Sequence, residues 1–547
     1  MGRWRLALGF VLSCVVGLPL ALPVVQALHD LGSWPLWQER DRFLALAGNT
    51  LRLVASTLAL ALPLGVLGAI LLYRTDLPGR RELRLLTLVT LFVPLPVFAS
   101  GWQAALGSGG LFSFVNPSNA TWSPWDQGLR AAVWIHAVAG LPWIIWLVGR
   151  GLCWVEPDLE EDALLGVRPA LVLWHVTLRR SRAAIGAAAL WVALQTATEV
   201  TVTDLMQVRT YAEEIYNQFV TSDRALVPRL VAVALPFTVI ACTLVAWTAA
   251  RWQRSLPPLT TLASAPWLFR LGWLRWPAFT AILASVGILV GVPLASIVWK
   301  AGLGGSPATW SITGLGDGLQ TVMRARASLV LWNLALALAA GLVTAWLGLL
   351  ASWLAVESRR FRAFVLVLVA MAWAMPAPAV GVGLKQTIDV VLDVLPFKPV
   401  AHALYYGPSP LPGAWIDVIR FFPYAVAVTW PIVRLLPPEL RDAARVDGAR
   451  PWQELRYVVF PLTLPVFLLA ASAVAVLSLG ELGAGKLVET PGSVTFAHEL
   501  FSQMHYGTNR DVAGLCLVLL LPVIAGGVAI GVAGRLRLRG WLDKPGG

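Results

Sequence analysis

Residues 438–451 read Pro438-Glu-Leu-Arg-Asp-Ala-Ala-Arg-Val-Asp-Gly448-Ala-Arg-Pro451. This polar stretch separates two long apolar runs, residues 415–435 and 462–484. A helix that crosses about 30 Å of hydrocarbon needs roughly 20 mostly apolar residues, so each run is long enough to span a bilayer. The stretch is therefore predicted to be a short loop at one membrane surface that joins two spans.

The residues of this loop predict two short helices with a break between them. Pro438 and Glu439 suit a helix start, because proline is tolerated in the first turn and an acidic residue complements the helix dipole. Gly448 is placed to end that helix, since glycine adopts the left-handed cap conformation easily. Pro451 can open a second short helix, and Pro461 can start the next span. We expect a helix–break–helix elbow that presents apolar and charged side chains to a partner.

Apolar runs of similar length recur along the whole chain of 547 residues. Hydrophobic residues make up 57% of the sequence and charged residues 13%, whereas soluble globular chains average about 25% charged residues. Within a lipid bilayer every backbone N–H and C=O must find a partner inside the protein, so these runs are expected to be helices. The predicted fold class is an all-α membrane protein with about twelve transmembrane helices. The predicted spans are residues 6–28, 51–73, 85–106, 130–149, 183–206, 228–250, 276–299, 328–355, 363–385, 415–435, 462–484 and 512–534.

The charged residues indicate how these spans are oriented. The net charge is +12, but the arginines gather in short loops between spans, as the positive-inside rule describes, so no nucleic-acid partner is expected. The loops after spans two, six and eight are basic, whereas residues 107–128 contain no Lys or Arg. Both termini are therefore predicted to face the cytoplasm. No segment between spans is long enough for a soluble catalytic domain, so we expect a transport subunit and not an enzyme.

A second elbow-like stretch follows the fourth predicted span. It reads Glu156-Pro-Asp-Leu-Glu-Glu-Asp-Ala-Leu-Leu-Gly166-Val-Arg-Pro169, and Gly166 precedes Gly448 at an offset of 282 (448 − 166). The same offset carries Glu199 onto Glu481, each near the outer end of the span that follows its elbow. Two further segments, residues 211–218 and 496–503, resemble each other at an offset of 285.

These matches predict a tandem duplication. One six-span unit is expected in residues 1–260 and the other in residues 261–547. Because six is an even number, the two halves are expected to be parallel and to face each other across a translocation path.

The two elbow stretches resemble the EAA loop of bacterial ABC importer permeases, in which Glu-Ala-Ala is followed after three residues by Gly, and then by Pro at the next span. The second loop is close to this pattern, with Asp442, Ala443, Ala444, Gly448 and Pro461. The first loop departs from it, with Glu160, Glu161 and Asp162 before Gly166, and Arg179 where the proline belongs. A fused chain with two such loops is similar to the ferric-iron transport permeases and to thiamine permeases.

The resemblance implies a type I importer permease in the bacterial inner membrane. A cytoplasmic ABC ATPase dimer would dock on the elbows and would use ATP and Mg, while the chain itself would bind no cofactor. A periplasmic or extracellular solute-binding protein would deliver the solute near residues 207–226 and 486–510. Ferric iron is the expected solute, and thiamine, phosphonate, polyamine and sulfate are the alternatives.

A gradient-driven secondary transporter with twelve spans is the rival from another class. Residues 76–81, Asp-Leu-Pro-Gly-Arg-Arg, overlap the loop signature of major facilitator transporters but carry Leu77 where that signature has Arg. Residues 480–487 nearly spell a phosphate-binding loop, yet Leu487 follows Lys486 where that motif needs Ser or Thr. We therefore expect no nucleotide site in this chain.

Three acidic residues are candidates for the translocation path: Glu199, Asp204 and Glu481. An ionisable group in or beside a span is costly and suggests a pathway, but these carboxylates could equally solvate helix ends. No pattern of metal ligands is evident. Asp417 and Arg420 are spaced i,i+3 and are predicted to form an ion pair on one helix face.

Overall fold

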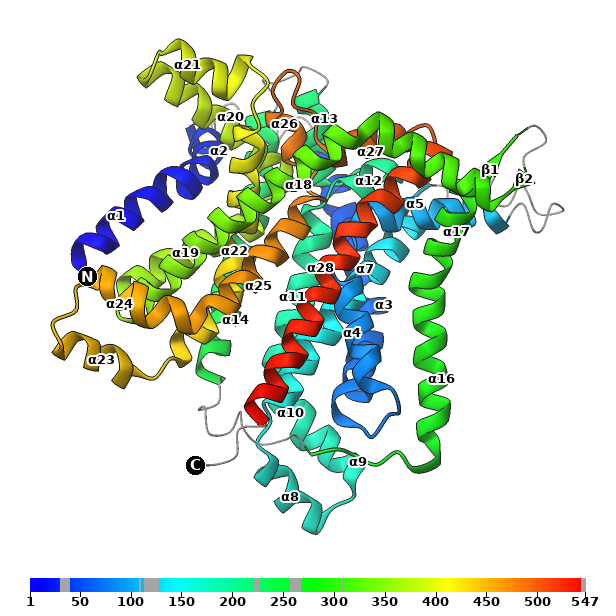
Figure 1. Ribbon diagram of the computed structural model, residues 1–547, viewed down its shortest axis with the longest axis vertical. Helices are drawn as coiled ribbons and strands as arrows, with labels where there is room; N and C mark the ends of the chain where they lie inside the picture. Colours follow the sequence, from blue (N-terminus) through cyan, green and yellow to red (C-terminus); the bar gives the residue numbers. More distant parts are fainter. Residues whose placement is uncertain are drawn as a thin grey trace.

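The computed structural model describes residues 1–29, 40–107, 110–112, 127–220, 227–255, 267–305 and 309–542. The predicted boundary at residues 260 and 261, residues 221–226 and most of the loop 107–128 lie outside the described residues. Among the described residues, a short antiparallel hairpin pairs β1 (Leu303–Gly304) with β2 (Thr309–Trp310), and helices dominate the rest (Figure 1).

The helices that build the molecule are, in chain order, α1 (Gly2–Leu12), α2 (Leu18–His29), α3 (Arg40–Arg74), α4 (Arg80–Thr90), α5 (Leu95–Leu106), α7 (Leu129–Cys153), α8 (Pro157–Gly166), α9 (Pro169–Val172), α10 (Leu178–Arg180), α11 (Arg182–Thr198), α12 (Thr201–Leu205), α13 (Tyr211–Val220), α14 (Val227–Ser255), α16 (Arg275–Val286), α17 (Val292–Gly302), α18 (Ile312–Val356), α19 (Arg359–Ala374), α20 (Ala377–Val394), α21 (Lys398–Ala401), α22 (Leu411–Leu435), α23 (Pro438–Val446), α24 (Pro451–Glu454), α25 (Phe460–Ser478), α26 (Gly485–Val488), α27 (Phe496–Met504) and α28 (Arg510–Leu542). Single π-helical turns interrupt several of them, at Ser13–Gly17, Leu173–Thr177, Gly287–Gly291, His402–Tyr406 and Leu455–Val459.

The described residues include eight helical stretches long and apolar enough to cross a membrane, or ten if each of two sharply bent helix pairs counts as one span. The chain is thus an all-α, multi-pass membrane protein. Each predicted span coincides with helical residues, including the shorter α11, which has 17 residues. The total of twelve spans stays a prediction.

The third and ninth predicted spans are not single helices. The axes of α4 and α5 differ by 101°, and those of α19 and α20 by 116°. A Pro-x-Pro motif stands at each bend, Pro94 to Pro96 and Pro376 to Pro378, at an offset of 282 (376 − 94). Pro94 and Pro376 have ψ angles of 143° and 140°, which are extended, and each of these prolines also disfavours a helical conformation of the residue before it. Residues 85–106 and 363–385, each predicted as one span, are therefore each a pair of helices with a sharp bend between them.

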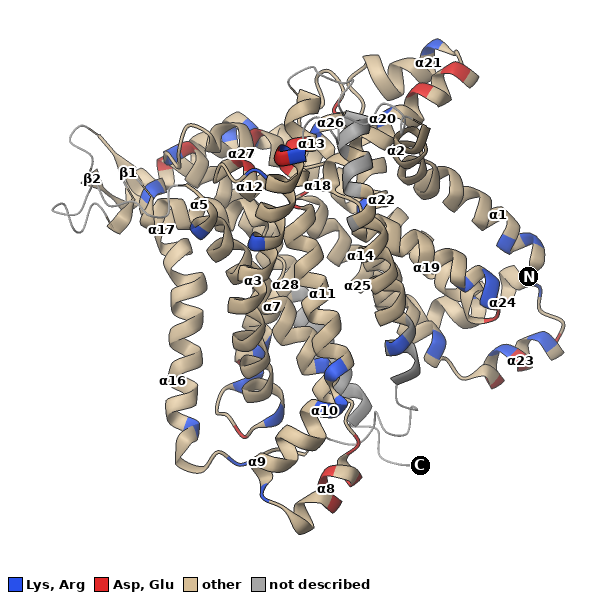
Figure 2. Cartoon of the chain, turned by 180° about the vertical axis from the view of Figure 1, so that it is seen from behind, with Lys and Arg blue, Asp and Glu red and all other residues tan. Residues whose placement is uncertain are grey.

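The short helices gather at two opposite ends of the molecule. We call residues 157–180 the first elbow and residues 438–459 the second elbow. The end of the molecule where both elbows lie is called the elbow end. Residues 199–220 form the first cap and residues 481–504 the second cap, and the end of the molecule where both caps lie is called the cap end. Figure 1 shows α8 and α23 at the lower end and α12, α13, α26 and α27 at the upper end. Lys and Arg residues occur in and around α10, α23 and α24 (Figure 2).

The first predicted span of each half packs on the other half. α2 packs against α20, and α17 packs against α5. A π-helical turn precedes each of α2 and α17, and a proline follows shortly after that turn, Pro19 in one and Pro293 in the other. A Cβ at Gly383 would overlap Pro19, and a Cβ at Gly101 would overlap Pro293. Gly101 and Gly383 are related by an offset of 282 (383 − 101), so matching positions permit both close approaches.

The same correspondence holds inside each half. α3 packs along α7, and α18 packs along α22. A Cβ at Gly65 would overlap Ile144, and a Cβ at Gly348 would overlap Ala425, at offsets of 283 and 281. Small residues let helix backbones approach closely, which is the main source of attraction between helices in lipid.

Candidate functional site

The first elbow is held to the body of the protein by a buried carboxylate. Glu160 is fully buried, pairs with the buried guanidinium of Arg74 at the end of α3, and accepts a hydrogen bond of 2.5 Å from the Thr177 hydroxyl. Arg74 also donates to the Leu152 carbonyl at 3.1 Å. Glu160 was predicted to belong to an ATPase-coupling loop, and its carboxylate points inward and anchors that loop.

The other predicted residues of the first elbow are at the surface. Glu161, Asp162 and Gly166 are exposed, and nothing lies within 4 Å of a Cβ built on Gly166. Gly166 is the last residue of α8, and the chain leaves the helix through Val167 in an extended conformation. These residues remain available for a partner.

The second elbow has the predicted helix–break–helix form. Gly448 has φ of +81°, the left-handed conformation expected of it, and Pro451 is the first residue of α24. The predicted start of a new span at Pro461 differs, because a π-helical turn joins α24 to α25 and the helix continues. Asp442 and Ala443 are exposed, and Ala444 is half-buried.

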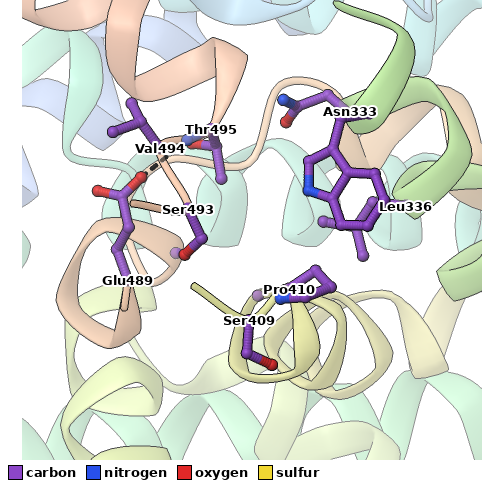
Figure 3. Close-up of a pocket in the computed structure, with 11 residues that line it drawn as sticks. Asn333, Leu336, Ser409, Pro410, Glu489, Ser493, Val494 and Thr495 are labelled. Carbon is purple, nitrogen blue, oxygen red and sulfur yellow. Dashed lines mark hydrogen bonds between the residues drawn. The ribbon is translucent and has the colours of Figure 1, made fainter. Parts of the chain in front are cut away.

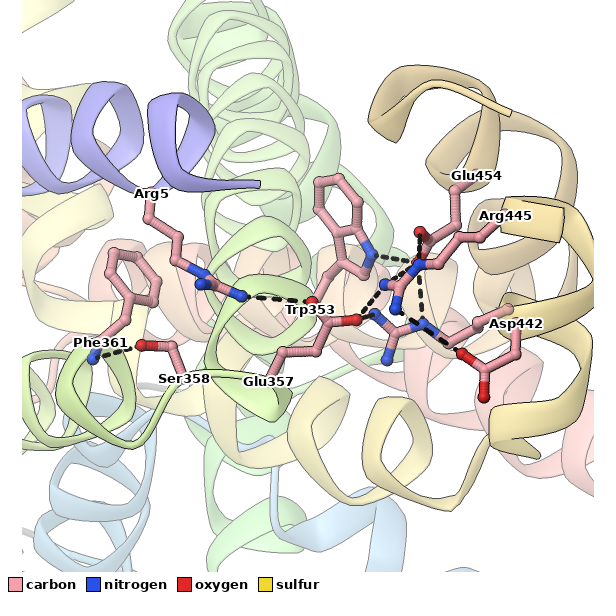
Figure 4. A network of polar contacts seen from close by, with 9 residues as sticks. Arg5, Trp353, Glu357, Ser358, Phe361, Asp442, Arg445 and Glu454 are labelled. Atoms are coloured by element: carbon pink, nitrogen blue, oxygen red, sulfur yellow. Dashed lines mark hydrogen bonds and ion pairs between the residues drawn. The ribbon is translucent and has the colours of Figure 1, made fainter. Parts of the chain in front are cut away.

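A network of charged side chains holds this elbow to the end of α18 (Figure 4). Arg441 donates to Glu454 at 2.8 Å and to Glu357 at 2.7 Å. Glu454 also accepts from Arg445 at 2.9 Å and from the Trp353 indole at 3.3 Å. These hydrogen bonds with Glu357 and Glu454 raise the pKa of Arg445, which stays charged.

The two elbow anchors occupy matching positions with opposite charge. Glu160 and Arg441 each come three positions after the proline that opens its helix, Pro157 and Pro438. Their partners, Arg74 and Glu357, are related by an offset of 283 (357 − 74), each at or just after the end of a long span. Sequence reasoning missed both partners, although the duplication offset pairs them.

The elbows carry apolar side chains that the protein leaves uncovered. Leu165 is 89% exposed and Val446 is 86% exposed, at matching positions with an offset of 281 (446 − 165). Leu159 and Leu440 are also exposed. Contiguous exposed apolar groups mark interaction surfaces, and these lie on short helices beyond the ends of the spans.

The candidate path residues Glu199 and Glu481 have matching contacts. Glu199 accepts from the backbone N–H of Val202 at 3.0 Å, and Glu481 from that of Ala484 at 3.0 Å, so both cap the helical turn that follows. Each also forms an ion pair with a basic residue of another helix. Glu199 lies 3.4 Å from His136 of α7, and Glu481 lies 3.5 Å from Arg420 of α22. The predicted pair of Asp417 with Arg420 is wrong, because the Arg420 guanidinium is turned to Glu481.

Asp204 joins the two caps. Its carboxylate lies 3.2 Å from His505 Nε2, at the end of the second cap. The hydrogen bond that His505 donates to the Asp204 carboxylate is the main cause of a raised pKa of His505. The ammonium of Lys486 lies over the rings of Tyr216 and Phe501, 5.3 and 5.5 Å from their centroids. The caps therefore meet through charged groups.

An aromatic cluster lies where helices α7 and α11 of the N-terminal half contact helices α19 and α22 of the C-terminal half. Trp191 lies 4.6 Å from Trp143, 4.8 Å from Trp373 and 4.9 Å from Tyr424, measured between ring centroids. Gln195 donates to the Tyr424 hydroxyl at 2.7 Å. Trp143 and Trp191 belong to the N-terminal half, and Trp373 and Tyr424 to the C-terminal half. We call these four rings the inter-half aromatic cluster.

No group of three or more His, Cys, Asp or Glu side chains that could hold a metal ion occurs within the residues the structure describes. The acidic residues above act as helix caps and ion-pair partners.

Comparison with known families defines the class of the C-terminal half. Residues 337–537 match the family described as the binding-protein-dependent transport system inner membrane component. The match runs from the middle of α18 into α28 and contains the second elbow and second cap. This half therefore carries an importer permease domain, which supports an ABC importer permease as the class of the protein.

Similar curated proteins come from Salmonella. A protein of Salmonella typhimurium named as a 2-aminoethylphosphonate transport system permease, PhnV, is 32% identical over 123 residues, which cover 22% of this chain and 46% of that protein. Proteins of the same name from Salmonella choleraesuis and Salmonella typhi match with the same identity. The chain thus spans about half the length of the curated relatives it matches.

Proposed function

We propose that this chain is the permease of an ATP-driven importer, with two permease halves fused in one polypeptide. The observation that carries the proposal is the pair of elbows, each anchored by an ion pair at matching positions and each exposing an apolar residue, Leu165 or Val446. Only one of these elbows lies in the matched permease domain. A second elbow of the same design is what a two-halved permease needs.

The duplication is supported by contacts at a nearly constant offset. The pairs Glu199–His136 and Glu481–Arg420 correspond at offsets of 282 and 284. The glycine contacts between α3 and α7 recur between α18 and α22. The π-helical turns Leu173–Thr177 and Leu455–Val459 are also related by an offset of 282 (455 − 173). Helix positions alone could agree by chance, but side-chain contacts that recur at a nearly constant offset favour a common six-span ancestor.

In this proposal a cytoplasmic ATPase dimer binds the elbows. Each elbow exposes apolar and acidic side chains. Its anchoring ion pair would make the elbow move together with the end of α3 or α18. When the ATPase closes on ATP, with Mg, the elbows are drawn together. The motion passes along α11 and α25, and the halves rock around the inter-half aromatic cluster. The elbow end would face the cytoplasm of a bacterial cell, with the protein in the inner membrane.

A solute-binding protein would deliver the solute at the cap end. Charged groups from both halves meet at the caps, including Asp204, Lys486 and His505. A solute-binding protein that docks there would contact both halves at once. The inter-half aromatic cluster lies on the route from the caps to the elbows and would close it in the present conformation. Glu199 and Glu481 would then act at the outer mouth of the path.

The solute is proposed to be small and charged. The names of the relatives favour a phosphonate such as 2-aminoethylphosphonate, whereas the resemblance to ferric-iron permeases favours Fe³⁺. Uptake of radiolabelled 2-aminoethylphosphonate and of ⁵⁵Fe by cells that express the transport system separates the two candidates.

Co-purification tests the proposed class. The tagged chain is purified from detergent as wild type and as a Leu165→Glu/Val446→Glu variant, and bound proteins are identified. An ATPase should accompany the wild type and be lost from the variant. Val394→Glu, at a 71% exposed position away from the elbows, is the control and should keep the ATPase. If no ATPase accompanies the wild type even after crosslinking, a gradient-driven transporter becomes the better account.

A further inference from the structure

Two adjoining cavities enter the C-terminal half from the cap end. The first is lined by the polar side chains of Ser409, Glu489, Ser493 and Thr495 (Figure 3). The second lies deeper and is lined by Asp417, Ser478 and Glu481. Five residues line both cavities and make them neighbours: Asn333, Leu336, Gly413, Gly485 and Thr495.

Asp417 is the unexplained group in the inner cavity. It is only 7% exposed, and among the described residues no hydrogen bond or ion pair reaches its carboxylate. A buried carboxylate without a partner is costly, because burial removes the water that solvates its charge. Since Asp417 lines the cavity, the cavity is the place from which its partner can come.

The charges around the cavity define what that partner must be. Glu481 already has two partners, the Arg420 guanidinium at 3.5 Å and the Ala484 N–H at 3.0 Å. The positive charge of Arg420 therefore balances Glu481, and the single negative charge of Asp417 is left over. A monovalent cation balances the site, whereas a multivalent metal ion would leave excess positive charge.

The size and donors of the cavity agree with a small ion. Its volume is about 20 Å³, enough for one water molecule or an ion of similar size. Asn333, Ser478, Thr495 and Glu481, all of which carry a side-chain oxygen, line it together with Asp417. Hard cations prefer carboxylate, carbonyl and hydroxyl oxygens as ligands.

We propose that Asp417 and Glu481, with the neighbouring oxygens of Asn333, Ser478 and Thr495, form a binding site for one Na⁺ ion that is reached from the cap end. The ion neutralises Asp417 and joins α22 to α18 and the second cap. The site binds Na⁺ without transporting it, and it does not depend on the proposed importer function.

The N-terminal half lacks this site and provides an internal control. His136 pairs with Glu199 as Arg420 pairs with Glu481, but residues 133–135 of α7, which precede His136, are Val, Trp and Ile. No acidic residue there corresponds to Asp417. One ion per chain is therefore expected, and not two.

Equilibrium binding of ²²Na⁺ to the full-length chain in detergent tests the proposal. The wild type should bind one Na⁺ per chain, and Asp417→Asn should bind at least about tenfold more weakly. Asp393→Asn, which changes an exposed carboxylate in α20, should bind as the wild type does. No saturable binding by the wild type, or full binding by Asp417→Asn, overturns the proposal.

Thermal unfolding of the wild type gives a second readout, which does not depend on whether the Asp417→Asn variant folds. The unfolding temperature of the wild type should rise with NaCl and not with choline chloride at the same ionic strength, because an ion that binds only the folded state stabilises it by mass action. Equal shifts in both salts would mean that Asp417 is held neutral by a proton, and the Na⁺ site would be rejected.

Discussion

The buried ion pairs at the elbows are the clearest case of single residues that decide local structure. Arg74 and Glu160 have no exposed side-chain surface, and Arg441 is 7% exposed between Glu357 and Glu454. Burying charges is tolerable when each has its partner, and strongly destabilising when one partner is removed. Matching positions of the two elbows therefore each keep an ion pair, although the order of the charges is reversed.

Glu160→Gln should destabilise the protein by about 3–5 kcal/mol, because it leaves the buried Arg74 without its counterion. The measurement is the shift in thermal unfolding of the detergent-solubilised chain. Glu161→Gln, at the next position and exposed, should change stability by less than about 0.5 kcal/mol. The reversed pair Arg74→Glu/Glu160→Arg should recover part of the loss. Equal effects of the two single variants would contradict the anchoring role.

The contact between the caps should depend on pH. The folded protein raises the pKa of His505 through its hydrogen bond with Asp204, so the protonated form is favoured by folding. The stabilisation is complete below the ordinary pKa of about 6.5 and is lost as the pH rises through the higher folded value. His505 is 44% exposed, so the effect should stay below about 1 kcal/mol.

The nearby carboxyl group of Glu213 also makes stability fall as the pH rises, so the experiment is done in a variant that lacks it. Burial, and then the charges of Asp204 and Glu214, raise the pKa of Glu213 to about 7, so its ionisation also lowers stability as the pH rises. The unfolding temperature is therefore compared between pH 5.5 and 8.5 in Glu213→Gln, with and without His505→Gln. A pH dependence that survives His505→Gln unchanged would rule out the His505–Asp204 contact as its source.

At the scale of helices, proline and glycine positions decide how the spans bend and meet. The two Pro-x-Pro motifs turn spans three and nine by 101° and 116°. Gly101 and Gly383 let the first span of one half lie directly on the other half. These features recur at one offset, so the sequence carries them in duplicate.

Gly383→Ala should weaken the seating of α2 on α20, because the added Cβ would overlap the Pro19 carbonyl. Overpacking of this kind costs about 1–3 kcal/mol. Gly287→Ala is the matched control, since nothing lies within 4 Å of its Cβ. Thermal unfolding should separate the two variants, and the interpretation of the close approach fails if Gly383→Ala is as stable as Gly287→Ala.

The helices were predictable from sequence because long apolar runs and local proline and glycine signals are properties of neighbouring residues. Gly448 and Pro451 act as predicted. The bends at Pro94 and Pro376 were missed, although the Pro-x-Pro motif was visible. The inward direction of Glu160 could not be seen, because its partner Arg74 is distant in the sequence. For a similar reason Arg420 forms its ion pair with Glu481 and not with Asp417. The contact with a distant segment of the chain is favoured over the contact with a neighbour on the same helix.

At the scale of the whole molecule, the halves are joined by the crossed first spans, the paired caps and the inter-half aromatic cluster. The crossed first spans lie at the sides of the molecule, and the paired caps lie at the cap end. The inter-half aromatic cluster lies between these contacts, and its rings come from both halves. A rocking motion of the halves must break or slide these ring contacts.

The cluster should therefore couple the stability of the two halves. In a double-mutant cycle, Trp191→Ala and Trp373→Ala should show an interaction energy of about 0.5–1.5 kcal/mol, as expected for a T-shaped aromatic pair. Trp191→Ala combined with Trp346→Ala, whose ring contacts Phe460 and Phe467, should be additive within about 0.5 kcal/mol. Additivity in the first cycle would mean that the cluster does not join the halves.

The most direct test of the central claim is site-specific crosslinking at the two elbows. Leu165→Cys and Val446→Cys are introduced separately after the four native cysteines are replaced by alanine, and the membranes are treated with a short bifunctional thiol reagent. Both variants should crosslink to one ATP-hydrolysing partner, and Val394→Cys should not. A crosslink at Val446 alone would mean that only the matched permease domain is coupled, and no crosslink at either elbow would contradict the importer account.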